Sequence, residues 1–267
     1  MAAVNLMDQP PPLPNPQSSA TPRAPMSLLA RLLNIFAIPG EVFEDVKRAP
    51  VSIGNWLVPI LLAAVIGATT ASLIFSQPTV VPELRDKQIK NTNELVAAGK
   101  MTRADGDQMI KLVEWVTQPA VLKIASAIAA IAISIVRVFW WAFILWVLGI
   151  VFLKRRFSYL KAAEVAGLAT LISVLGEIVM LLLTFGFGEH GGSAGLTMTE
   201  LAAKQQMPVR LILANVFSIW LVGLMAAGLA HLAEVRFSRT FLIVLGYWIL
   251  FQMGLALSGA AMIGAMK

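Results

Sequence analysis

The 267-residue sequence contains no cysteine and few charged residues. Without cysteine the chain can form no disulfide, no thiolate zinc site and no cysteine nucleophile. Charged residues make up 13% of the chain, against about 25% in an average soluble domain. Hydrophobic residues make up 58%, and the mean hydropathy is +0.77. These values indicate an integral membrane protein, and its long apolar runs predict an all-α polytopic helical bundle.

The sequence also lacks the motifs of common enzyme classes. It has no phosphate-binding loop, no His-Glu-x-x-His motif, no Ser, His and Asp set and no paired catalytic carboxylates. His231 and Glu234 stand one helical turn apart, but two ligands are too few for a metal site, and an interfacial histidine is the simpler interpretation. We therefore expect a protein that is not an enzyme and holds no metal and no cofactor.

An apolar stretch at the start of the chain is also missing, so we expect no cleavable signal peptide and a first span that directs insertion. The formal net charge is +6, which would suggest nucleic acid as the partner of a soluble protein. Here the basic residues lie beside apolar runs, which is the orientation signal of membrane proteins. The expected partner is therefore the lipid bilayer and not nucleic acid.

The first 25 residues hold seven prolines and almost no large apolar side chains. Such a segment cannot bury enough surface to offset its ordering entropy, so residues 1–25 are predicted to form a disordered tail. An alternative is a polyproline docking segment for a partner domain. From residue 27 to 47, apolar residues at helical spacing predict two short helices separated by Pro39-Gly40. They are expected either to lie at the cytoplasmic interface, with Arg31, Lys47 and Arg48 near headgroups, or to pack against the bundle.

Five apolar runs are long enough to cross a membrane. They cover residues 56–76, 119–153, 162–187, 208–233 and 241–266 approximately, so residues 26–267 are predicted to form a five-span membrane domain. Pro59 falls in the first turn of the first run, where its missing amide hydrogen costs little. Residues 77–118 form a polar insert with balanced charges, predicted to be two helices, the first ending before Gly99 and the second capped by Thr102.

Clusters of lysine and arginine predict the orientation of the spans, because such clusters stay in the cytoplasm. The residues concerned are Lys47, Arg48, Lys154, Arg155, Arg156, Arg236 and Arg239. They place the amino terminus and two interhelical turns in the cytoplasm, and the carboxyl terminus and the insert 77–118 outside. The two turns contain the same tripeptide, Arg-Phe-Ser, at residues 156–158 and 236–238. This repeat suggests either a duplicated hairpin or a chance match of three residues.

One charged residue stands within each of the second and third runs. Counted from the turn between them, Arg137 lies 17 residues above Lys154 and Glu177 lies 16 above Lys161, or roughly 24 to 26 Å at 1.5 Å per residue. Because an unpaired charge is costly in lipid, we predict an Arg137–Glu177 salt bridge that sets the register of the hairpin. A proton or ion relay and a lid over a cavity are the functional alternatives.

Small and polar residues recur at three- and four-residue spacing on these two runs, a pattern that favours close helix packing in membranes. The predicted packing residues are Ala163, Gly167, Thr170 and Ser173 on the third run and Ser134, in a matching stripe, on the second. Gln252 in the fifth run is interpreted as an interhelical hydrogen bonder.

Short motifs at the entry to the first span carry a resemblance to a known family. Pro39-Gly40-Glu41-Val42-Phe43, then Arg48-Ala49-Pro50, then Trp56-Leu57-Val58-Pro59, followed by five spans, resemble the bacterial branch of the Yip (Ypt-interacting protein) domain family. The resemblance covers roughly residues 28–266 and implies an α-helical, five-span protein with a cytoplasmic amino terminus. The Asp-Leu-x-Gly-Pro motif of eukaryotic relatives is absent here, which argues against binding of small GTPases.

These observations favour a non-enzymatic scaffold or adaptor in membrane organisation or trafficking-like processes, located in the bacterial inner membrane. We expect it to contact a protein partner or a second copy of itself. The alternative is a small permease or channel that uses the polar stripes of spans two, three and five.

Overall fold

The computed structural model describes residues 24–186 and 207–265, and over these residues the chain is helical, without a strand. This confirms the all-α prediction. Residues 1–23 of the predicted tail lie outside the described residues. The helices are α1 (Leu28–Asn34), α2 (Pro39–Arg48), α3 (Gly54–Phe75), α4 (Val80–Ala97), α5 (Arg103–Val116), α6 (Pro119–Val151), α7 (Tyr159–Gly186), α9 (Met207–Ala233) and α10 (Phe237–Ala265).

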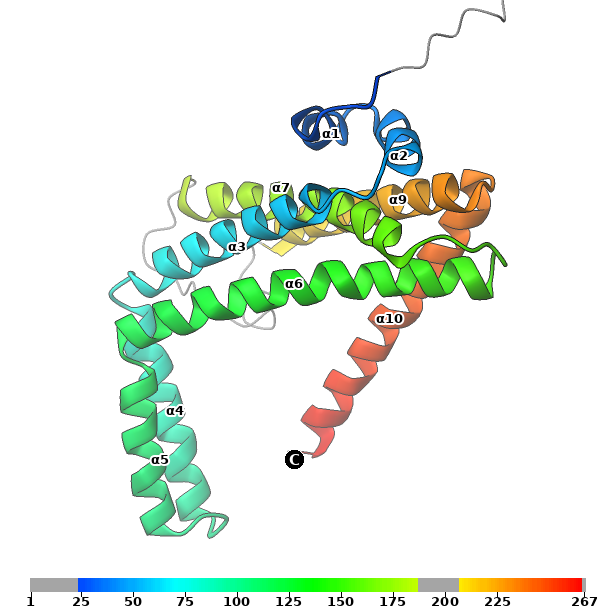
Figure 1. The fold of residues 1–267 in the computed structure, drawn as a ribbon. Coiled ribbons are helices and arrows are strands. Elements are labelled where there is room, and N and C mark those ends of the chain that lie inside the picture. The colour runs from blue at the N-terminus through cyan, green and yellow to red at the C-terminus, as the bar shows by residue number, and fades with distance from the viewer. Residues whose placement is uncertain (1–23, 187–206, 266–267) are drawn as a thin grey trace, which may run out of the picture.

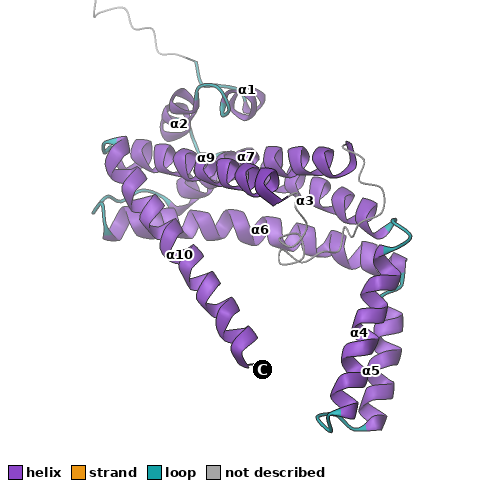
Figure 2. Cartoon of the chain, turned by 180° about the vertical axis from the view of Figure 1, so that it is seen from behind, coloured by secondary structure: helices purple, strands orange, loops and turns teal. Residues whose placement is uncertain are grey.

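The helices α3, α6, α7 and α9 run alongside one another and form the body of the molecule (Figure 1). Together with α10 they supply five helices that are long and apolar enough to cross a membrane, which confirms the predicted number of spans. The hydrophobic core is centred on α7, which is the most buried span and packs against α3, α6 and α9. Helix α10 follows α9 and then diverges from the other four helices, as Figure 2 shows from behind.

The start of the first span differs from the prediction. Helix α3 begins at Gly54, two residues earlier than expected, so Pro59 is the sixth residue of the helix and lies inside it. A proline there leaves the carbonyl four residues before it, that of Asn55, without its helical donor. The same stretch of α3 lies against α7, where a Cβ added to Gly167 would come within 2.6 Å of the Asn55 oxygen. The proline therefore falls where the two helix backbones approach most closely.

The polar insert forms an antiparallel pair of helices, α4 and α5, that projects from one end of the bundle (Figure 1). Helix α4 begins at Val80 and ends at Ala97, before Gly99 as predicted. Gly99 adopts a positive φ of +68° directly after α4, and the Thr102 side chain accepts a hydrogen bond from the Asp105 amide at the start of α5. These are the turn and the cap that the sequence predicts.

The two basic turns lie together at the other end of the bundle (Figure 1). In both, a residue other than glycine adopts the left-handed conformation two positions before the shared arginine: Lys154 with φ 53° and Glu234 with φ 54°. This match at equivalent positions extends the similarity of the turns beyond three residues and supports duplication of the hairpin. Which end of the bundle faces the cytoplasm remains a prediction.

Helix α2 packs against the bundle and not into lipid. Val42, Phe43 and Val46 are fully buried, and they face α9 and α7. Of the two predicted placements for this helix, the structure therefore shows the second. Helix α1 completes a small cap over the bundle with α2, and its outer residues Leu29 and Leu33 remain exposed.

Candidate functional site

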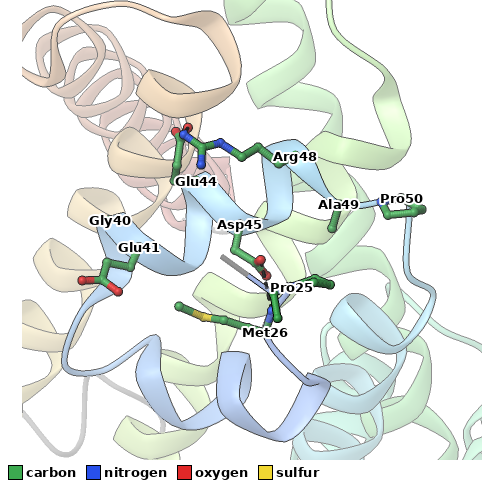
Figure 3. Close-up of a pocket in the computed structure, with 10 residues that line it drawn as sticks. Pro25, Met26, Gly40, Glu41, Glu44, Asp45, Arg48, Ala49 and Pro50 are labelled. Atoms are coloured by element: carbon green, nitrogen blue, oxygen red, sulfur yellow. Dashed lines mark hydrogen bonds and ion pairs between the residues drawn. The ribbon is translucent and has the colours of Figure 1, made fainter. Parts of the chain in front are cut away.

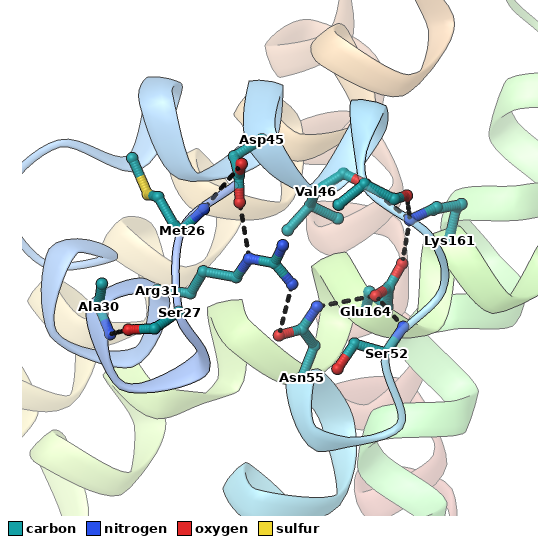
Figure 4. Close-up of polar contacts among 11 residues, drawn as sticks. Met26, Ser27, Ala30, Arg31, Asp45, Val46, Ser52, Asn55, Lys161 and Glu164 are labelled. Carbon is teal, nitrogen blue, oxygen red and sulfur yellow. Dashed lines mark hydrogen bonds and ion pairs between the residues drawn. The ribbon is translucent and has the colours of Figure 1, made fainter. Parts of the chain in front are cut away.

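A continuous polar network holds α1 and α2 on the bundle (Figure 4). Arg31 of α1 donates from Nε to Asp45 Oδ2 of α2 at 2.7 Å and lies 3.4 Å, through Nη1, from Asn55 Oδ1 at the start of α3. The other Asp45 oxygen accepts from the Met26 amide at 3.1 Å. The Arg31 side chain is only 6% exposed, so the prediction that it lies near lipid headgroups is wrong. Its charge is neutralised inside the protein by Asp45.

The network continues into α7 through Glu164, which is completely buried. Glu164 Oε1 accepts from the Ser52 amide and from Asn55 Nδ2, each at 2.7 Å. Its other oxygen lies 2.7 Å from Lys161 Nζ. Lys161 Nζ also donates hydrogen bonds to the carbonyls of Val46 and Ala49 at the end of α2. A cation therefore caps the carboxyl end of α2, and an anion faces the amino end of α3, as the helix dipoles favour.

The network is neutral and each of its charges has a partner. It pairs two cations, Arg31 and Lys161, with two anions, Asp45 and Glu164. Buried groups satisfied in this way rigidify the elements that carry them, because removing one partner leaves another buried and unpaired. The cluster is thus suited to fixing a shape rather than to reacting with a substrate.

Sequence reasoning missed Glu164, Asn55 and Asp45 as members of one site. Glu164 follows Lys161 by three residues on the face that carries Ala163 and Gly167, and a carboxylate among small residues was the available signal. The partners in α1, α2 and α3 lie more than 100 residues away in the chain, and no spacing rule connects them.

A second set of ion pairs ties α2 to α9. His231 Nδ1 lies 3.1 Å from Glu44 Oε2, and Lys47 Nζ lies 2.8 Å from Glu234 Oε1. Arg48 pairs with Glu44 at 2.7 Å. The hydrogen bond with His231, aided by the charges of Lys47 and Arg48, holds the pKa of Glu44 below its ordinary value. The hydrogen bond and charge of Lys47 lower the pKa of Glu234 in the same way.

These contacts assign roles to the predicted interfacial residues. Lys47 and the mostly exposed Arg48 act within the contact between α2 and α9. The basic residues of the two turns are all exposed; they are Lys154, Arg155, Arg156, Arg236 and Arg239. His231 and Glu234 turn to different partners, and over the described residues no group of three potential metal ligands comes together.

An open pocket of about 460 Å³ lies on the outer side of α2, as Figure 3 shows. Its walls are the α2 residues Glu41, Glu44, Asp45 and Arg48, and the segments at Pro25-Met26 and Ala49-Pro50. The floor is rigid, because Asp45 and Met26 are already joined by a hydrogen bond of the network. The pocket is also where the proline-rich segment enters the described structure.

The predicted charge pair lies in another part of the bundle. Arg137 Nη1 of α6 donates to Glu177 Oε1 of α7 at 2.7 Å, and the two side chains are 26% and 37% exposed. The structure therefore brings these two residues together. Unlike Arg31 and Glu164, they are not sealed from their surroundings.

The packing residues on α7 face a different helix than expected. Ala163, Gly167 and Thr170 are buried, and Gly167 lies against the backbone of Trp56 in α3. Thr170 donates to the Gly167 carbonyl, and Ser173 is half-buried. On α6, Ser134 donates to its own helix at Ala130, whose side chain faces Gly67 of α3. The two stripes thus both meet α3, because the first span lies against the hairpin.

The chain was compared with known proteins. A family model described as the Yip1 domain matches residues 33–258. No curated protein and no solved structure gives a significant match. The matched segment includes α2, the first four spans and most of α10. It covers the polar network from Asp45 to Glu164 but not Arg31.

Proposed function

The chain belongs to the Yip1 domain family and is a multi-pass integral membrane protein in contact with lipid; from this premise we propose that it is a non-enzymatic scaffold or adaptor. In this proposal α1, α2 and residues 24–27 form a rigid cytoplasmic platform, which the bundle holds at the surface of the bacterial inner membrane. A protein partner or a second copy of the chain would bind to that platform in membrane organisation or trafficking-like processes.

The observation that carries this proposal is the buried network from Asp45 to Lys161. Two short helices of 7 and 10 residues are too short to be stable alone. Here they are held by Arg31, Asp45 and Glu164, which join them to α3 and α7. Such a fixed arrangement of short helices outside the spans is expected of a docking surface, because binding then costs little ordering entropy.

The open pocket on α2 supplies a place for the partner. It combines the carboxylates of Glu41 and Glu44 with apolar walls from Pro25, Met26 and Pro50. Arg48 remains 74% exposed beside it. A mixed polar and apolar surface of this kind is typical of transient protein interfaces.

Purification of the full chain in a mild detergent tests the proposal. We expect one partner in fixed stoichiometry, and we expect Glu164→Gln, which loosens the platform without touching the pocket, to reduce its recovery severalfold. Asp107→Asn on the exposed surface of α5 is the control that should leave recovery unchanged. Solute or ion flux through liposomes that Glu177→Gln abolishes would overturn the scaffold proposal in favour of a permease or channel.

The permease alternative keeps one supporting observation, a cavity beside Glu177 in the span region that is lined in part by Ser173 and Ser218. Against it, the polar stripes of spans two, three and five form no common polar path over the described residues, since of the residues in these stripes only Arg137 and Glu177 are joined across helices. Ser134 bonds to its own helix, Glu177 pairs with Arg137, and Gln252 is exposed on α10.

A further inference from the structure

The cavity beside the Arg137–Glu177 pair has the chemistry of a ligand site. It lies between α7 and α9 and measures about 250 Å³. Its polar lining is Ser173, Glu177 and Ser218, and its apolar lining includes Met180, Phe217 and Leu221. Gly176 makes room for the aromatic wall, because a Cβ there would lie 2.9 Å from Phe217 Cγ.

The ion pair next to the cavity is incompletely satisfied by the protein. Arg137 uses Nη1 for Glu177, while its buried Nε has no hydrogen-bond partner in the described structure. Glu177 is 37% exposed. Within a membrane, charges in this state are expensive unless a further polar group reaches them. A ligand with its own charges would supply that group to the exposed parts of the Arg137 and Glu177 side chains, although not to the buried Nε.

The depth of the pair suggests where such a ligand comes from. Arg137 lies 14 residues before the end of α6 at Val151, and Glu177 lies 18 residues after the start of α7 at Tyr159. At 1.5 Å per residue these are about 21 and 27 Å, in a hydrocarbon core of about 30 Å. Both residues therefore lie in the leaflet far from the basic turn. Headgroups of that leaflet can be reached by an arginine side chain with modest local thinning of the bilayer.

The residues that line the cavity favour one class of lipid headgroup over others. A carboxylate, two hydroxyls and the aromatic side chain of Phe217 form a suitable environment for an ammonium group. Arg137 does not line the cavity, but its guanidinium is 2.7 Å from the Glu177 carboxylate and 26% exposed, which suits a phosphate at the edge of the cavity. The arrangement places a cation site and an anion site next to each other, as in a zwitterionic headgroup.

We propose that the cavity between α7 and α9 binds a phospholipid whose headgroup carries a primary ammonium, of the phosphatidylethanolamine type. The ammonium donates to Glu177 and Ser173, and the phosphate accepts from Arg137. The acyl chains lie along the exposed apolar surface of α9 at Val216 and Ile219. This lipid site is independent of the platform on α1 and α2 and goes beyond the scaffold proposal.

Thermal unfolding of the purified full chain in detergent micelles tests the site. Dioleoyl phosphatidylethanolamine should raise the midpoint clearly more than phosphatidylcholine, which has no ammonium hydrogens, or phosphatidylglycerol, which has no ammonium. Native mass spectrometry should show about tenfold preferential retention of the first lipid. Glu177→Gln should remove the preference, and so should Ser173→Val, which removes the hydroxyl and narrows the cavity without changing charge. Asp107→Asn should preserve it.

Three results would overturn the proposal. Equal effects of the three lipids would show a general lipid coat only. An unchanged preference in both Glu177→Gln and Ser173→Val would place the lipid elsewhere, and Ser173→Val decides the point if the glutamate variant does not fold. Soluble glycerophosphoethanolamine acting as strongly as the lipid would show that the ligand is not drawn from the membrane.

Discussion

The protein carries two clusters of charge along α7, and they differ in almost every physical respect. At the end near the basic turn, Glu164 is fully buried: Oε1 accepts two hydrogen bonds, and Oε2 forms an ion pair with Lys161 but accepts no hydrogen bond. Some 13 residues further along the same helix, Glu177 has one protein partner and is more than a third exposed. The first cluster connects four helices, whereas the second connects two and opens on a cavity. A closed network of this kind defines a shape, and an open pair leaves capacity for a ligand.

The largest difference in stability between the two clusters is expected when the central carboxylate of each is removed. Glu164→Gln leaves Lys161 buried without a counter-charge, and breaking a buried pair from one side costs about 3–5 kcal/mol. Unfolding midpoints in detergent should therefore fall far more for Glu164→Gln than for Glu177→Gln. Equal midpoints for the two variants would contradict the distinction between a closed and an open cluster.

A glycine beside each cluster offers a matched steric test. A Cβ on Gly167 would lie 2.4 Å from the Cα of Trp56, so α3 and α7 would have to separate, at a cost of about 1–3 kcal/mol. The nearest atoms to a Cβ on Gly176 would belong to the Phe217 side chain, with Cγ at 2.9 Å, so that side chain and not a helix backbone would have to shift. Gly167→Ala should accordingly lower the unfolding midpoint more than Gly176→Ala, and Gly246→Ala, which has open space, is the control. The reverse order would show that the packing at α3 is not tight.

Exchanging the charges within each cluster should give a smaller and more specific contrast. Arg137→Glu or Glu177→Arg alone should cost about 1–3 kcal/mol, and the double exchange should recover at least half, since one contact joins the pair. Exchanging Lys161 and Glu164 should give no rescue, because each also bonds to groups of fixed polarity, the carbonyl of Val46 and the amide of Ser52. Failure of rescue at Arg137 and Glu177 would argue against their role in hairpin register.

Lowering the pH should have the smallest of these effects on stability, and it should act through the surface contact between α2 and α9. The pKa of Glu44 is lowered in the folded protein by His231, Lys47 and Arg48, so its contribution is present above the unfolded pKa and is lost as pH falls through the folded value. Between about pH 6 and about pH 3 the loss should stay under about 1 kcal/mol, as for other exposed pairs. The pH slope of the unfolding midpoint should be flatter in Glu44→Gln. An identical slope in the variant would show that Glu44 does not contribute to the pH dependence of stability.

Much of the architecture follows from the sequence because membrane spans are coded locally. Apolar length alone predicts five spans, and glycine and threonine predict the turn at Gly99 and the cap at Thr102. The contact of Arg137 with Glu177 is also foreseen, since a shared turn fixes the relative depth of its two helices. The start of α3 was misplaced because a proline was assumed to mark the first turn.

What the sequence could not show depends on how the helices are arranged in space. Arg31 was expected among headgroups because an isolated amphipathic helix would place it there, but Asp45, 14 residues later, gives it a buried partner. Glu164 was overlooked because an acid in an apolar run has no local partner except Lys161. The cavity between α7 and α9 depends on side chains of two spans that no local pattern relates.

The order of synthesis gives the closed network a further consequence. Glu164 and Lys161 bond to groups that precede them by 109 to 115 residues, so α1, α2 and α3 leave the ribosome well before their partners exist. Until α7 and α9 have been made, the apolar side of α2 at Val42, Phe43 and Val46 lacks the bundle surface that covers it. The network can therefore close only after α7 has been synthesised, later than the helices that it holds in place.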